Sequence, residues 1–84
     1  MQTEKEWRAA RFRGLLASQE PRRLTVPGFM VRLRQAANGR QVPSQSHVYA
    51  EWWRDRGYGP RDPALVALVC QILGCDEDDL FQRG

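Results

Sequence analysis

The stretch from Asp62 to Arg83 constrains the fold more than any other part of the chain. Asp62 and Pro63 are typical of the cap and first position of a helix, and the residues from Ala64 to Leu73 are almost all apolar. A helix that is apolar on nearly every side has to be surrounded by other helices. The stretch therefore predicts an all-α fold with this helix buried at its centre.

A short second helix is predicted after Gly74, a residue type that commonly ends helices. Asp76 can cap this helix, and Asp78 and Asp79 favour the positive N-terminal end of its dipole. Leu80 and Phe81 would then fold back onto the core.

The N-terminal part of the chain predicts a helix of its own. Thr3 and Glu6 fit a capping box, so the helix is expected to run from there to about Ser18. Pro21 ends it, because a residue before proline avoids the helical region. A basic connector, residues 22–24, follows. The apolar stripe of this helix consists of Trp7, Phe12, Leu15 and Leu16.

Two further helices are expected between this connector and Asp62. The first begins at Thr25, carries a buried face and stops at Asn38-Gly39; that face is Phe29, Met30 and Leu33. The second begins at a cap, Ser44 or Ser46, and continues to about Arg56. Its Val48 and Trp52 are four residues apart and share a core-facing side.

The whole chain, residues 1–84, is expected to form one domain, a compact five-helix bundle without a sheet. Residues 1–24 supply the N-terminal helix and connector, and residues 25–84 supply the other four helices. The start of the chain lacks the apolar core of a signal peptide, and no apolar run approaches the ~20 residues of a membrane span. We therefore expect a cytoplasmic protein.

The two cysteines, Cys70 and Cys75, are interpreted as a small core residue and a helix-junction residue. A metal site would need more ligands, and His47 is the only histidine. A disulfide conflicts with a reducing cytosol. No set of side chains suggests catalysis, so neither an enzyme nor a cofactor is expected.

Charge is distributed unevenly along the chain. Residues 1–61 hold 12 basic and 5 acidic side chains, a net charge of +7, whereas residues 62–84 hold 1 basic and 5 acidic, a net charge of −4. Twelve of the 13 basic residues are arginine, which suits phosphate and guanine recognition and is also common in GC-rich genomes. The basic part is the candidate face for a polyanion.

Residues 62–81 combine a helix that starts with proline, a Leu-Gly-Cys-Asp junction and an Asp-Asp-Leu-Phe ending. In these features they resemble the last two helices of the lambda-repressor/Cro-like (XRE-type) helix-turn-helix DNA-binding domain. Residues 44–52 are similar to the recognition helix of that family. Residues 53–60 resemble the link between its third and fourth helices. The resemblance extends poorly to residues 1–43.

Two departures from the family pattern predict an atypical turn. The place of the usual small residue and glycine in the turn holds Gln41, Val42 and Pro43. Trp52 also lies one residue further from Val48 than the pattern prefers.

The resemblance implies a DNA site on the third helix, whose first residues would face base edges in the major groove. Arginines before the turn would hold phosphates, and Arg54, Arg56 and Arg61 would hold the flanking backbone. For each arginine, the alternative is a solvated surface side chain. The residues expected at bases are Ser44, Gln45, Ser46, His47 and Tyr49, and those expected at phosphates before the turn are Arg32, Arg34 and Arg40.

The function predicted on this basis is a small DNA-binding transcription regulator of phage or plasmid type, associated with the nucleoid and acting as a homodimer on a pseudo-palindrome. An alternative is a protein-binding module that inhibits or recruits a host protein, such as RNA polymerase or a nuclease. Because Trp52 and Trp53 cannot both face inward, Trp53 is the candidate protein interface. A third possibility is an architectural protein that binds DNA without sequence preference.

Overall fold

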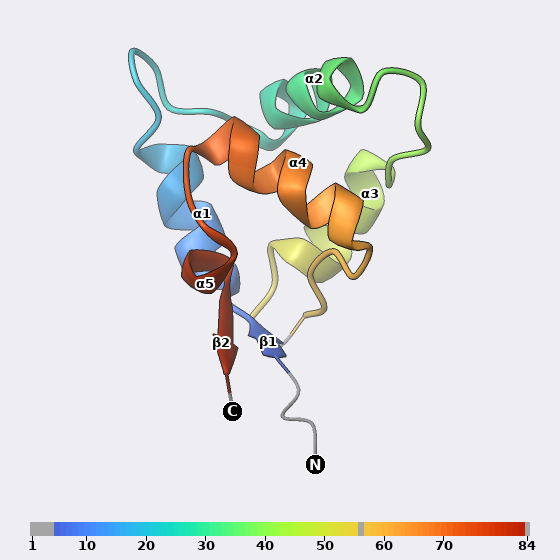
Figure 1. Ribbon diagram of the computed structural model, residues 1–84. Coiled ribbons are helices and arrows are strands. Elements are labelled where there is room, and N and C mark those ends of the chain that lie inside the picture. The colour runs from blue at the N-terminus through green and yellow to red at the C-terminus, as the bar shows by residue number, and fades with distance from the viewer. Residues whose placement is uncertain (1–4, 56, 84) are drawn as a thin grey trace.

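A computed structural model describes residues 5–55 and 57–83 of the chain, and these residues are mostly helical, as expected (Figure 1). A short strand pair joins the two ends of the described chain. The elements in order are β1 (Lys5–Trp7), α1 (Ala9–Ala17), α2 (Val26–Ala37), α3 (Gln45–His47), the π-helical turn η1 (Val48–Trp52), α4 (Pro63–Leu73), α5 (Glu77–Leu80) and β2 (Phe81–Arg83).

The capping signals of α2 and α4 act as the sequence predicts. The Thr25 hydroxyl accepts a hydrogen bond from the Gly28 amide at 3.3 Å, and the Asp62 carboxylate accepts one from the Ala64 amide at 3.0 Å. Asn38 and Gly74 cap the C-terminal ends with left-handed backbones, at φ values of 51° and 67°. The bounds of both helices are therefore determined by residues adjacent to them.

The prediction for the N-terminus is wrong over the described residues. Its helix begins at Ala9, and Lys5–Trp7 forms a strand that pairs antiparallel with Phe81–Arg83. The Arg8 amide donates to the Leu80 carbonyl at 2.8 Å and extends this connection. Thr3, the proposed cap, lies outside the described residues. The expectation of no sheet is also wrong, because the two ends of the chain supply each other with backbone partners.

Burial of Trp7 explains why this segment is extended. The indole is 8% exposed, and its Nε1 donates to the Trp52 carbonyl at 2.7 Å. Its ring lies 5.3 Å from that of Phe12 and 5.2 Å from that of Phe81, measured between centroids. Phe29 completes this aromatic core, with its ring 5.4 Å from that of Phe12 and 6.2 Å from that of Trp52. The strand thus places one large side chain where four elements meet.

The α4 helix is less buried than the sequence predicts. It runs across the front of the molecule in Figure 1 and buries Val66, Val69 and Leu73. Pro63, Ala67 and Gln71, which are four residues apart, form an exposed stripe. A domain of this size has too few neighbouring elements to enclose one helix on every side.

The third predicted helix is shorter than expected and changes its winding. It ends at Trp52 in the π-helical turn, where the Trp53 amide donates to the Val48 carbonyl at 2.9 Å. A π turn holds one residue more than an α turn. Val48 and Trp52 are both buried, at 0% and 1% exposure, as predicted.

Candidate nucleic-acid interface

At the start of α3 the backbone is capped and the side chains are exposed. Ser44 is the N-cap, and its hydroxyl accepts a hydrogen bond from the His47 amide at 3.2 Å. Gln45, Ser46 and His47 are all exposed. Because the cap satisfies a backbone donor at the helix start, these side chains remain available for a ligand.

An aromatic pair continues the exposed side of this helix. Tyr49 and Trp53 are 44% and 36% exposed, and their ring centroids lie 5.8 Å apart. Exposure of Trp53 agrees with the argument that only one of the adjacent tryptophans can face inward. Arg13 holds the backbone beneath this pair, because its guanidinium donates to the Trp53 carbonyl and to the Asp55 carboxylate, the latter at 3.1 Å.

Arg13 and Trp7 are positioning residues that the sequence analysis did not identify. Both donate to carbonyls at the C-terminal end of the α3–η1 helix, where backbone acceptors lack helical partners. Each contact joins residues that are 40 or more positions apart in the chain. No local pattern signals such a contact.

Two arginines outside the predicted site have acidic partners. Arg11 forms an ion pair with Asp79 at 3.5 Å, and Arg13 forms one with Asp55 at 3.1 Å. Arg61, one of the arginines predicted at the flanking backbone, stacks over the Tyr58 ring at 4.9 Å. Arg56 lies outside the described residues. The exposed arginines of the predicted site form no ion pair with any residue that the structure describes, and the same is true of Arg8, Arg22, Arg23 and Arg61; those of the site are Arg32, Arg34, Arg40 and Arg54.

The structure does not bring all of the predicted phosphate contacts to one side. Arg32 and Arg34 are two residues apart on α2, so they project about 200° apart around its axis. Residues 38–44 connect α2 to α3, a longer link than the three or four residues of a typical helix-turn-helix. Within this link, the Arg40 amide donates to the Ala37 carbonyl at 3.1 Å, and Val42 packs against the core.

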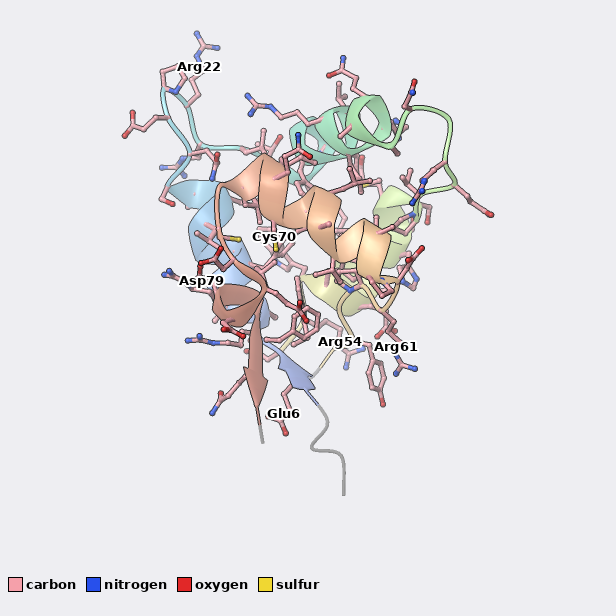
Figure 2. All side chains as sticks on the ribbon, viewed as in Figure 1. Glu6, Arg22, Arg54, Arg61, Cys70 and Asp79 are labelled. Carbon is pink, nitrogen blue, oxygen red and sulfur yellow. The ribbon has the colours of Figure 1, made fainter. Side chains whose placement is uncertain are left out.

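The segment that contains α2, the link and α3 carries no negative side chain. Residues 21–50 include five arginines and neither aspartate nor glutamate. Carboxylates gather instead at α5, which has Glu77, Asp78 and Asp79 in its first turn. Figure 1 shows α2 and the links on either side of it at the upper end of the molecule and α5 with the strands at the lower end. The carboxylate-free segment 21–50 therefore lies apart from the carboxylates of α5, whereas Arg11 pairs with Asp79, and Arg54 and Arg61 lie in the lower half of the molecule (Figure 2).

Cys70 lies on α4 (Figure 2), and Cys75 lies in the junction that follows this helix. Both are half-buried, and the Cys75 amide donates to the Cys70 carbonyl at 3.0 Å. Burial raises the pKa of Cys70, and burial together with the neighbouring Cys70 raises the pKa of Cys75 to about 12. Cys70 is thus less buried than a core residue, and neither thiol has the lowered pKa of a nucleophile.

No group of three or more histidine, cysteine, aspartate or glutamate side chains is arranged to hold a metal ion within the described part of the chain. In the same residues, no helix has both the length and the apolar character needed to cross a membrane. Comparison with models of protein families, with curated proteins and with solved structures gives no match for this chain.

Proposed function

We propose that the protein is a small DNA-binding transcription regulator that reads the major groove with the α3–η1 helix. One observation carries the proposal: residues 21–50 bear five arginines and no carboxylate, and Arg32, Arg34 and Arg40 in this segment have no ion-pair partner among the described residues. A surface that served only solubility would mix charges of both signs. A surface that binds phosphates keeps its cations available.

Each part of the segment has a distinct role in this proposal. Gln45 can form two hydrogen bonds with an adenine edge, and Ser46 and His47 can reach neighbouring bases. Arg40 and one of the two α2 arginines hold phosphates and set the register, and Arg54 holds the backbone at the other end of the helix. Tyr49, on the exposed side of the helix, packs against apolar base edges such as the thymine methyl.

A homodimer on a pseudo-palindrome follows from the small size of this element. The α3–η1 helix spans eight residues, about 12 Å at 1.5 Å per residue. A single module of this kind buries little surface on DNA, and a second copy on a half-site one helical turn away multiplies the affinity.

Selection of bound duplexes from a random pool tests the proposal. The expected result is a single enriched motif whose binding weakens steeply with salt. Gln45→Ala with Arg40→Ala should abolish preference for that motif and leave the fold unchanged by circular dichroism. If no duplex is bound at any salt concentration, the proposal is wrong; if all duplexes bind equally, the protein is an architectural DNA binder.

The exposed Tyr49–Trp53 pair favours a second candidate, a module that binds a host protein such as RNA polymerase or a nuclease. Interfaces between proteins are enriched in tyrosine, tryptophan and arginine, and Trp53 is flanked by Arg54. This candidate predicts that the chain forms a stable complex with a protein and that Trp53→Ala disrupts this complex. It also predicts that the chain shifts no DNA in a gel.

A further inference from the structure

The link between α1 and α2, residues 18–25, is a loop that is anchored at both of its ends. The Leu24 amide donates to the Leu16 carbonyl at 2.8 Å. The Gln19 side-chain nitrogen donates to the Leu15 carbonyl at 3.0 Å and to the Leu73 carbonyl, at the end of α4, at 3.1 Å. The loop is therefore tied to two helices.

Two adjacent arginines occupy the exposed part of this loop. Arg22 and Arg23 are both exposed, and neither forms an ion pair with a described residue. Figure 2 shows Arg22 projecting from the upper end of the molecule, while Asp79 lies about half-way down and Glu6 lies at the lower end. Within the part of the chain that the structure describes, Leu24 and Gln19, and not these two charges, make the contacts that hold the loop.

The loop continues the basic surface around α2. In Figure 1 it lies beside the upper end of α1, and α2 and the link 38–44 continue along the same end of the molecule. Glu20 is the single carboxylate of residues 18–50. The arginines of this surface, which we call the basic edge, are Arg22, Arg23, Arg32, Arg34 and Arg40.

We propose that the Arg22–Arg23 loop is a second DNA contact, which grips the phosphate backbone of the duplex beyond the base pairs that α3 reads. This inference rests on the proposed function. The molecule is 39 Å in its longest dimension, close to the ~34 Å of one turn of B-DNA. A duplex held at α3 can therefore meet the loop within about one helical turn, where its phosphates again face the protein.

The anchoring of the loop lowers the entropic cost of this phosphate contact. A mobile arginine loses conformational freedom when it binds a phosphate, whereas a tied loop has already lost most of its backbone freedom. Two arginines on such a loop fix the angle at which the domain sits on the duplex, and that angle sets the register of α3.

The experiment compares two double variants with the same change in charge, using the duplex recovered by selection. Arg22→Ala/Arg23→Ala removes two charges from the basic edge. Arg8→Ala/Arg11→Ala removes two from the opposite, acidic end, near Asp79. Circular dichroism and thermal unfolding establish that both variants remain folded. Binding is measured between about 0.05 and 0.3 M salt, a range over which the Debye length falls from about 14 Å to about 6 Å.

Loss of two phosphate contacts should reduce the slope of log K against log salt concentration by about 1.8 in magnitude. It should also weaken binding by up to ~60-fold at about 0.1 M salt. The Arg8/Arg11 control should change affinity by less than about threefold, since charges beyond a Debye length are screened. Glu20→Gln should act in the opposite direction and strengthen binding. In hydroxyl-radical footprints, the loop variant should lose a protected patch outside the selected motif.

The outcomes separate this inference from the proposed function. If the wild-type protein binds DNA but the loop variant matches the control in slope, affinity and footprint, the loop is no DNA contact and the inference is wrong. If the wild-type protein binds no duplex, the proposed function is wrong and the loop contact falls with it.

Discussion

Replacement of Gly59 by alanine should destabilise the protein by forcing Trp7 out of place. A β-carbon at position 59 would lie 2.2 Å from both Cδ2 and Cε3 of Trp7, whereas carbon atoms in contact normally lie about 3.5–4.0 Å apart. The indole cannot move aside freely. It is 8% exposed, it packs on Phe81, and it donates a 2.7 Å hydrogen bond to the Trp52 carbonyl.

The size of the effect follows from these contacts. Overpacking of a core costs about 1–3 kcal/mol, and leaving a buried donor or acceptor without a partner costs a further 1–3 kcal/mol. The sum, about 2–6 kcal/mol, is a large part of the 5–15 kcal/mol that stabilises a typical domain. At about 4–8 °C per kcal/mol for a chain of this length, the Tm should fall by at least ~8 °C.

Thermal unfolding followed by tryptophan fluorescence and near-ultraviolet circular dichroism measures the change. Gly14→Ala is the matched control, because the same added methyl group on α1 meets no atom within 4 Å. That control should stabilise the protein by up to about 1 kcal/mol, since alanine favours a helix over glycine. Equal Tm values for Gly59→Ala and the wild type, or shifts of the same sign in both variants, would refute the reasoning.

A double variant identifies the clash as the cause. Trp7→Leu removes the atoms that the new methyl group would meet, so Gly59→Ala should cost less in that background than in the wild type. The expected coupling is about 0.5–3 kcal/mol in favour of the double variant. Additive effects would mean that the alanine acts on something other than Trp7.

Two further predictions concern titratable groups. The pKa of Cys75 is raised to about 12, so little of this thiol is ionised at pH 9. Its alkylation by iodoacetamide at pH 9, followed by peptide mass spectrometry, should be at least ~100-fold slower than that of a free thiol, and the rate should still rise with pH at about pH 10–11. Equal rates for Cys75 and a free thiol would contradict this assignment. The Asp76 amide and, less strongly, Arg11 lower the pKa of Asp79, so its carboxylate stabilises the fold above pH 3.8 and this contribution is lost as the pH falls through the folded pKa. Asp79→Asn should therefore lower the Tm at pH 6, and the difference from wild type should shrink below pH 3.8; a difference independent of pH would contradict the mechanism.

Local signals predicted the helices that have strong caps. Thr25, Asn38, Asp62 and Gly74 all mark observed ends of α2 and α4. A cap acts within one turn through a hydrogen bond or a backbone angle, so the sequence around it contains the whole cause. The same is true of the Ser44 cap, which marks the observed start of α3, whose first residues are exposed.

Contacts between residues far apart in the chain determined the features that the sequence did not predict. Lys5–Trp7 forms a strand because Phe81–Arg83 offers backbone partners and the core has room for an indole, which outweighs a local capping box. The same holds for the exposed stripe of α4, which depends on how many neighbours a small domain can supply.

The sequence by itself determined where α2 and α4 begin and end and which end of the chain is acidic. Only the tertiary structure decided which arginines form ion pairs, such as Arg11 and Arg13, and which stay available along the basic edge. The physical reason is that helix caps are satisfied by near neighbours, whereas the partner of a surface charge is chosen by the packing of elements far apart in the chain.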